Sequence, residues 1–98
     1  MSLIEDKVYS LKESKWIKNE DHEIWTYTYD DKDIKEEDYP IIDIILDTFD
    51  KEEASEILEN YNLITRVDTG DKKLIFYCYE EKPEIDLAIR IKINHQYT

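Results

Sequence analysis

Residues 85–94 decide the fold, and they read IDLAIRIKIN. Large aliphatic side chains occupy every odd position from Ile85 to Ile93, and small or polar residues occupy every even one. Because successive side chains of a β-strand point to opposite faces, this alternation places all the large aliphatic side chains on one side. The segment therefore predicts a strand with one buried and one solvent-facing side, as in an antiparallel sheet.

Further strands are indicated on the N-terminal side of this segment. Residues 63–68 and 73–80 are rich in β-forming residues, and the chain's single glycine, Gly70, lies between them. Glycine adopts positive φ angles without strain, so we expect it to supply the turn of a hairpin. Aromatic and β-branched residues alternate over 24–29, and we expect this strand to pair with residues 16–18 across a polar turn.

Two adjacent helices are expected in the middle of the chain. The first spans about Pro40–Phe49, because proline suits a first helical position and apolar residues recur there with helical spacing. Its expected buried residues are Ile41, Ile42, Ile45, Leu46 and Phe49. The second helix is expected to be capped by Asp50, with Glu53 three residues later. Its expected inward residues are Ala54, Ile57, Leu58 and Tyr61.

A short N-terminal helix is also expected. Ser2 and Glu5 have the spacing of a capping box, and apolar residues then recur on one helical face at Ile4, Val8 and Leu11. The segments together predict a single α+β domain over residues 1–98, in the order α-ββ-αα-βββ. We expect an antiparallel sheet of about five strands to pack against the two central helices.

The charge of the chain is concentrated in its middle third. Residues 30–59 contain thirteen acidic and three basic side chains, a net charge of −10 out of the total of −12. Residues 1–29 carry −2, and residues 60–98 are neutral. The acidic excess is therefore a local feature of the two expected helices and the loop before them, and it does not coat the whole surface.

The sequence contains no complete catalytic motif. Asp68-Thr69-Gly70 matches the aspartic protease triplet, but a chain with one glycine lacks that site's other glycine-dependent parts, and a hairpin turn explains these residues. The acids from Asp31 onward lack the glycine and glutamate of a calcium-binding EF-hand. We expect Cys78 to be a core residue and His22 and His95 to be solvated. We therefore expect no enzymatic activity, no cofactor and no metal.

We also expect neither membrane insertion nor direct binding of nucleic acid. The first residues lack the basic and apolar regions of a signal peptide, and the most apolar stretch, 40–46, is interrupted by Asp43, so a cytoplasmic location is expected. Trp25, Tyr27 and Tyr29 form an aromatic row that could stack on bases. A strongly acidic chain repels phosphate, however, so packing in a core or a dimer is the better interpretation of this row.

The acidic segment suits a basic protein partner. Regularly spaced carboxylates can imitate the phosphates of a nucleic acid, so we expect an inhibitor that blocks a nuclease or another nucleic-acid-binding protein by DNA mimicry. In composition alone, the chain resembles phage-encoded anti-restriction and anti-CRISPR proteins and inhibitors of DNA-repair glycosylases, which act in the host cytoplasm. The expected partner-binding residues are Asp31, Asp33, Glu36, Glu37, Asp43, Asp47, Glu52, Glu53, Glu56 and Glu59.

Two alternative functions are compatible with the same sequence. An immunity protein or antitoxin could neutralise a nuclease toxin with its acidic helix, and barstar-like inhibitors are similar in size and charge. A structural or regulatory domain would instead associate with itself through the aromatic row or an exposed strand edge, so the sequence allows a monomer or a homodimer.

Overall fold

Strand β7 (Leu87–Gln96) is the central strand of a three-stranded antiparallel sheet, called sheet A here. Its neighbours are β1 (Ser2–Leu11) on one side and β4 (Tyr39–Ile44) on the other. The computed structural model describes the backbone of residues 2–96 and the side chains of residues 6–93. Within these limits, β1 pairs with β7 along its whole length, so β7 is hydrogen-bonded on both edges.

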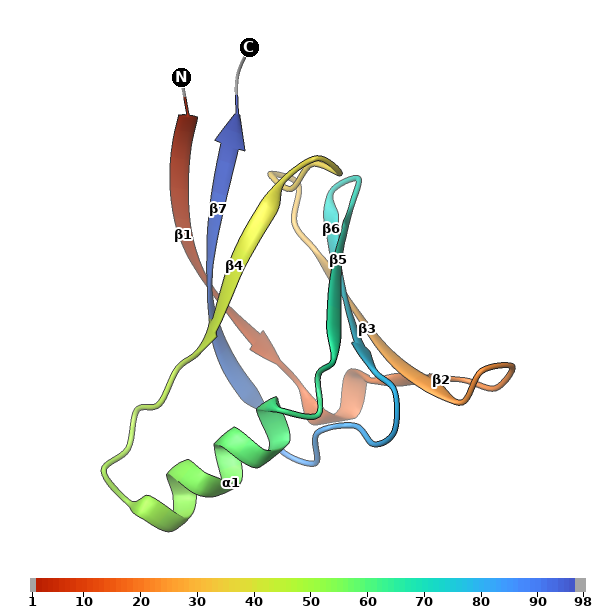
Figure 1. The fold of residues 1–98 in the computed structure, drawn as a ribbon, viewed down its shortest axis with the longest axis vertical. Coiled ribbons are helices and arrows are strands. Elements are labelled where there is room, and N and C mark those ends of the chain that lie inside the picture. Colours follow the sequence, from red (N-terminus) through yellow and green to blue (C-terminus); the bar gives the residue numbers. More distant parts are fainter. Residues whose placement is uncertain (1, 97–98) are drawn as a thin grey trace.

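The remaining strands form a second antiparallel sheet, sheet B, which faces sheet A (Figure 1). Its strand order is β2 (Ile17–Asn19), β3 (Ile24–Asp30), β6 (Lys73–Cys78) and β5 (Arg66–Gly70). A short 3-10 turn, η1 (Glu13–Lys15), links the two sheets, and α1 (Lys51–Tyr61) links β4 to β5. The chain is thus a small α+β domain with seven antiparallel strands in two sheets, which confirms the predicted class. The predicted arrangement of one sheet of about five strands against two central helices is wrong, because the second layer of the core is another sheet.

The core lies between the inner faces of the two sheets. The alternation over residues 85–94 is confirmed, because Leu87, Ile89, Ile91 and Ile93 are all at most 1% exposed. Sheet B contributes the inner residues of β3 and β6, and the predicted aromatic row packs into or against this core. The buried apolar residues are Tyr9, Leu11, Trp16, Tyr27, Ile34, Leu74, Phe76, Cys78, Leu87, Ile89, Ile91 and Ile93.

The predicted N-terminal helix is wrong, since these residues form strand β1. The spacing of Val8 and Leu11 fits a helical face, but Val8 lies exposed on the outer side of sheet A. Tyr9 and Leu11 are buried instead, with the period of two that a strand requires. Pairing with the free edge of β7 decides the outcome, because it satisfies the backbone of both strands and adds two large side chains to the core.

The predicted helix over Pro40–Phe49 is also wrong. Residues 39–44 form β4, and the chain then continues without regular structure to the start of α1. Ile42 and Ile44 face the core, whereas Ile41 faces solvent. Ile45 N–H donates to the Ala88 carbonyl (3.0 Å), which shows that the odd-numbered residues of this segment form the backbone hydrogen bonds to β7. The nitrogen of Pro40 therefore faces the other edge of β4, which has no neighbouring strand. A proline is tolerated at that position of an edge strand because no hydrogen bond is lost.

The predicted second helix is confirmed as α1, beginning after the cap residue Asp50. The Asp50 carboxylate accepts hydrogen bonds from the backbone N–H groups of Glu52 and Glu53. Ile57 and Tyr61 pack against the core as expected, but Leu58 is exposed. Within residues 2–96, no helix combines the length and the apolar character needed to cross a membrane. Among residues 2–96, α1 is the one α-helix, where two central helices were predicted.

The hairpin around Gly70 is confirmed, but not the predicted reason for its glycine. The positive φ angle of this turn, 62°, belongs to Lys72, and Gly70 has an ordinary negative φ. A Cβ atom added to Gly70 would lie 2.8 Å from Cε of Lys73. Glycine therefore allows the Lys73 side chain to pass closely over the neighbouring strand.

The position of Cys78 leads to a first prediction. Its side chain is fully buried, and burial raises the pKa of the thiol to about 12. We expect no reaction of the native protein with an aromatic disulfide reagent at neutral pH, and stoichiometric reaction in denaturant, because only the accessible thiolate is nucleophilic. Rapid labelling of the native protein, followed by colour release over time, would contradict the buried position of this strand residue.

Candidate functional site

The structure divides the predicted partner-binding acids between opposite ends of the molecule (Figure 1). One group follows β3, in the loop of residues 31–38, and lies beside the β5–β6 turn. The other group lies on α1 and on the segment that leads into it. Asp43 belongs to neither group, because it is on the outer face of sheet A. The predicted residues therefore do not form one surface.

The carboxylate of Asp31 in the first group already has partners within the chain. Lys7 Nζ donates to both Asp31 oxygens at 2.9 and 2.8 Å and to Asp33 Oδ2 at 2.9 Å. The Tyr9 hydroxyl also donates to Asp31. Burial by itself would raise the pKa of Asp31, but the hydrogen bonds from Lys7 and Tyr9 outweigh it, so the pKa is lowered. These contacts fasten β1 of sheet A to the loop that follows β3 of sheet B.

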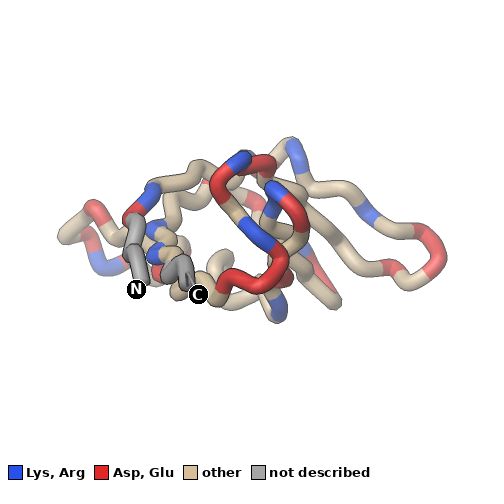
Figure 2. The backbone as a smooth tube through the Cα atoms, turned by 90° about the horizontal axis from the view of Figure 1, so that it is seen from above, with Lys and Arg blue, Asp and Glu red and all other residues tan. Residues whose placement is uncertain are grey.

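Acidic and basic residues alternate along the chain at this end, as the coloured backbone in Figure 2 shows from above. Residues 30–38 and 71–73 contain seven acids and four lysines, and Lys7 adds a fifth cation. Glu36 and Glu37 are exposed. Asp38, in contrast, is buried, and its carboxylate accepts a hydrogen bond from the Lys35 N–H at 2.9 Å. The loop end is therefore nearly balanced in charge, and two of its acids serve the fold.

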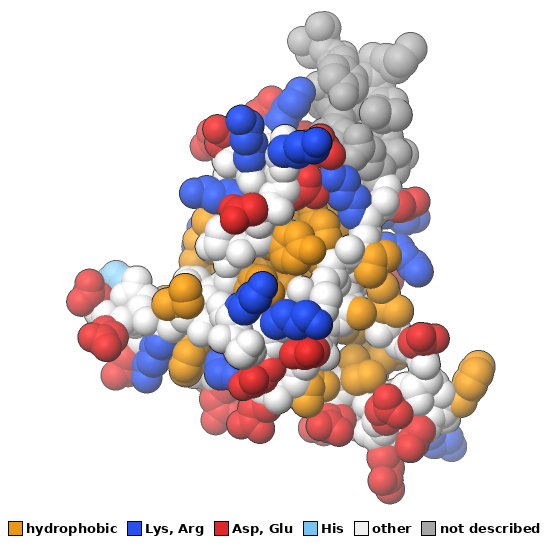
Figure 3. All heavy atoms as spheres, turned by 180° about the vertical axis from the view of Figure 1, so that it is seen from behind, with side chains coloured by type: hydrophobic (Ala, Val, Ile, Leu, Met, Phe, Trp, Pro, Cys, Tyr) orange, Lys and Arg blue, Asp and Glu red, His pale blue; other side chains and the backbone are white. Residues whose placement is uncertain are grey.

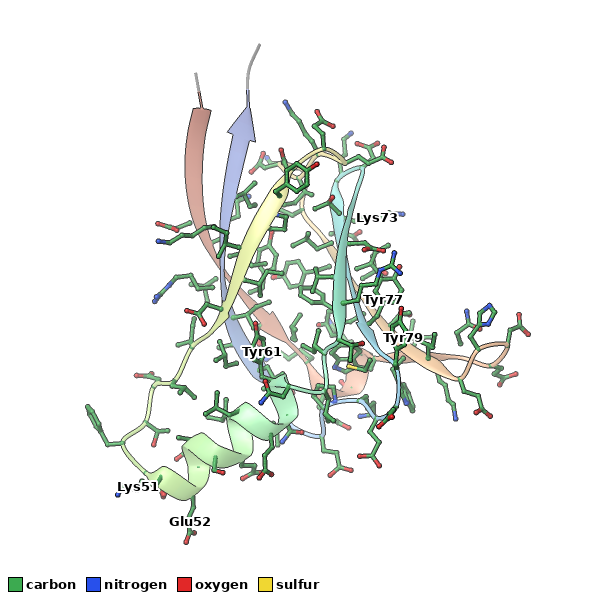
Figure 4. All side chains as sticks on the ribbon, viewed as in Figure 1. Lys51, Glu52, Tyr61, Lys73, Tyr77 and Tyr79 are labelled. Carbon is green, nitrogen blue, oxygen red and sulfur yellow. The ribbon has the colours of Figure 1, made fainter. Side chains whose placement is uncertain are left out.

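Helix α1 presents its acids to solvent at the opposite end. Glu53 accepts a hydrogen bond from the Thr48 hydroxyl and helps to hold the start of the helix. Glu52, labelled in Figure 4, points away from the body of the protein, whereas Tyr61 points toward the sheets. Glu52, Glu56 and Glu59 share one face by their spacing, and among the described residues none of them has an ion-pair partner.

Some of these helical acids have a structural explanation, and some do not. Glu52 and Glu53 lie in the first turn, where a negative charge is favourable because of the helix dipole. Glu59 lies near the C-terminal end, where it is unfavourable, and the last turn contains no basic residue. Three like-charge pairs remain in the helix, between Glu56 and each of Glu52, Glu53 and Glu59, at a cost of about 0.2–0.5 kcal/mol each. Asp43 and Asp47 would be one turn apart on the predicted helix over Pro40–Phe49, but neither residue is helical, so they add no like-charge pair.

A second acidic stretch, which is not among the predicted partner-binding residues, lies beside α1. Glu84 N–H donates to Asn60 Oδ1 at 2.8 Å, which places residues 80–84 against the end of the helix. Glu59, Glu81 and Glu84 line one hollow of the surface, and Glu80 lines the adjoining one. All four glutamates are exposed.

The only base of this stretch is directed inward. Lys82 Nζ lies 2.6 Å from the Glu13 carboxylate and 5.8 Å from the centre of the Trp25 ring. It neutralises Glu13 and leaves the neighbouring glutamates uncompensated.

We call residues 47–59 and 80–84 together the acidic end. It contains nine carboxylates and two lysines, so its net charge is −7 of the total −12. Figure 3 shows the acidic side chains gathered along the lower edge of the molecule.

An exposed aromatic residue accompanies the acidic end. Phe49 was predicted to be buried on a helix, but it lies on the irregular segment before α1 and is fully exposed. Asp47 and Asp50 flank it, and Leu46 and Leu58 are exposed nearby in the chain. A fully solvated phenylalanine contributes nothing to the core, so this position is available for contact with another molecule.

Sequence reasoning missed Phe49 and the glutamates of residues 80–84 for different reasons. Phe49 was misplaced because β4 was read as a helix. The glutamates were overlooked because the last third of the chain is neutral as a whole, although its bases lie mainly on the strands. Counting charge in windows of five to ten residues would have revealed the excess at residues 80–84.

The other sequence motifs occupy structural positions. Asp68 lies in β5, where its carboxylate is 2.9 Å from Arg66 Nε, so the Asp68-Thr69-Gly70 triplet belongs to the hairpin. His22 is exposed in the turn between β2 and β3, and the His95 side chain lies outside the described side chains. Among the described residues, no group of three or more His, Cys, Asp or Glu is placed to hold a metal ion.

No protein-family model, curated protein or solved structure matches the chain.

The Asp31 cluster leads to a second prediction. Asp31→Asn should lower the free energy of unfolding at neutral pH by about 1.5–3 kcal/mol, because a hydrogen-bonded, largely buried charge is lost. The lowered pKa means that the carboxylate stabilises the fold above its ordinary value of 3.8 and ceases to do so as the pH falls through the lowered value. Urea unfolding at neutral pH and at a pH below 3.8 should therefore show a smaller difference between the variant and the unmodified chain at the lower pH.

Asp33→Asn is the matched control for this experiment. Asp33 contacts the same lysine from a more exposed position, so its loss should change stability by less than about 1 kcal/mol. Equal destabilisation by Asp31→Asn at both pH values would contradict the assigned role.

Proposed function

We propose that the protein binds a basic protein partner through its acidic end and blocks the surface with which that partner binds nucleic acid. The observation that supports this proposal is the convergence of two acidic stretches, far apart in the sequence, at one end of the molecule (Figure 3). Several of these acids have no role in the fold and oppose one another within α1. A basic surface would relieve this repulsion on binding.

The number of negative charges at the acidic end approaches that of a short segment of nucleic acid. The eleven residues of α1 span about 16 Å at 1.5 Å per residue. Duplex DNA of this length carries about ten phosphates, at one per 1.7 Å. The acidic end presents nine carboxylates: four on α1, two on the segment before it and three on residues 80–84. Such a surface can occupy a cleft that evolved to hold phosphates, and electrostatic attraction would accelerate its association.

Phe49 would add a non-electrostatic contact to this surface. Interfaces owe most of their affinity to a few buried anchors, often aromatic, surrounded by a polar rim. Phe49 with its two flanking aspartates has this arrangement. The partner we infer therefore combines a basic surface with an apolar recess. A nucleic-acid-handling enzyme of a defence system and a nuclease toxin both fit this description.

The experiment that tests the proposed function is a capture experiment with the tagged protein. The tagged protein is incubated with a lysate of the cells that carry its gene, or of the bacterial host if the gene is viral. We expect a basic nucleic-acid-binding protein to be retained at low salt, and to be released both by high salt and by an excess of duplex DNA. Retention of a partner that DNA does not displace would contradict mimicry.

Charge reversal separates the acidic end from the total charge. Glu56→Lys with Glu59→Lys should abolish partner binding, whereas Glu36→Lys with Glu37→Lys at the opposite end should leave binding nearly unchanged. Both double variants alter the net charge from −12 to −8, and all four positions are exposed. Binding is measured by titration calorimetry with the captured partner. Equal loss of affinity in the two variants would mean that the position of the charge does not matter.

Phe49→Ser tests the anchor. Affinity for the partner should fall by about tenfold or more, as for other interface anchors. The melting temperature should not change, because the side chain is fully exposed. Ile17→Ser is the control, because Ile17 is 70% exposed and lies on β2, outside the acidic end, so this change should leave the affinity unaltered. Unaltered affinity of the Phe49 variant would limit the interface to electrostatics.

A further inference from the structure

The outer face of sheet A is an open surface of a different character. It is formed by the outward residues of β1, β7 and β4, and it is distinct from the acidic end. Val8, Tyr39 and Ile41 are exposed there, Ile41 to 67%. Three such exposed hydrophobic side chains on one small sheet face are more than scattered surface residues, and they indicate a contact surface.

The charged residues of this face are balanced and unpaired. Arg90 and Lys92 on β7 are flanked by Asp43 on β4 and Asp6 on β1. Among the described residues, none of these four side chains forms an ion pair. The face is therefore locally neutral, although the chain carries a net charge of −12. Two copies of so acidic a protein repel each other, and a neutral apolar face is where this repulsion is smallest.

We infer that a second copy of the chain binds this face in a two-fold symmetric dimer. The register supplies the complementarity, because Arg90 lies directly opposite Asp43 on the neighbouring strand, and Lys92 lies opposite Ile41. A two-fold axis parallel to the strands, between β7 and β4, places each β7 residue over the equivalent β4 position of the other copy. Arg90 then meets Asp43 of the second copy, twice, and the Lys92 stems cover Ile41.

The outer face of sheet B differs in how its charged and aromatic residues are arranged. Arg66 forms an ion pair with Asp68 and lies over the ring of Tyr77, 5.5 Å from its centre. Tyr77 is labelled in Figure 4. Ile75 and Tyr77 on this face are half-buried. Ile17 at the edge of this sheet is nevertheless 70% exposed, which makes it a close structural match for Ile41.

The size of sheet A sets the strength of the association. About this axis only β7 and β4 face each other, and two strands about 4.8 Å apart and about 20 Å long cover roughly 200 Å² per copy. A standard interface buries about 800 Å² per partner, so the dimer is weak and forms at high protein concentration. Because the acidic end is not part of this face, dimerisation does not depend on the proposed function, and acidic-end variants should dimerise normally.

The first test compares two isoleucine substitutions by sedimentation equilibrium, up to about 1 mM protein. The unmodified chain should show a reversible monomer–dimer equilibrium, and Ile41→Thr should raise its dissociation constant about tenfold. Ile17→Thr, the same change at a similarly exposed edge-strand position of sheet B, should have no effect. A monomer throughout the concentration range, or an equal effect of both substitutions, would overturn the inference.

A charge swap tests the symmetry of the dimer. Arg90→Asp should abolish dimerisation, because it places like charges opposite each other across the axis. Adding Asp43→Arg to this variant should restore dimerisation, since each copy then again presents opposite charges at the paired positions. Thermal unfolding at low concentration checks that each variant is folded. The proposed dimer would be overturned if the double variant were folded but did not dimerise. It would also be overturned if the unmodified chain did not self-associate and Ile41→Thr abolished binding of the basic partner.

Discussion

The burial of one face of β7 is the constraint on which the rest of the structure depends. Its four inward aliphatic side chains are almost completely excluded from solvent, and each such side chain contributes roughly 1.5–3 kcal/mol when buried. This burial requires a second apolar layer, which sheet B provides with the inner residues of β3 and β6. It also leaves both edges of β7 to be paired, which draws the two flanking segments into β1 and β4.

Because the two sheets supply the core, α1 is peripheral to it. The helix contacts the core through Ile57 and Tyr61 near its C-terminal half, and no residue of the helix is fully buried. Its exposed face can therefore accumulate acidic residues at a cost of about 1 kcal/mol, which is small against a typical stability of 5–15 kcal/mol. The peripheral position of the helix is what makes a highly charged, exposed surface compatible with a fold of this size.

Local signals account for the parts of the structure that the sequence predicts well. Three features depend on a few neighbouring residues each: the strand at residues 85–94, the hairpin around Gly70 and the helix cap at Asp50. Each of them can therefore be predicted from its own segment of the sequence. The predicted first helix at Pro40 failed because a run of isoleucines fits a helical face and an edge strand equally well. Which one forms depends on whether β7, nearly fifty residues later, offers a free edge. The same edge competition converted the N-terminal segment into a strand.

The sequence by itself determined the α+β class, the buried strand at its centre, the capped acidic helix and the overall negative charge. Only the tertiary structure decided which acids are available for a partner. It committed Asp31 to Lys7 and Tyr9, buried Asp38, and brought the glutamates of residues 80–84 against α1. The physical reason is that charge is a property of composition, whereas its exposure and its neighbours depend on contacts between segments that are distant in the chain.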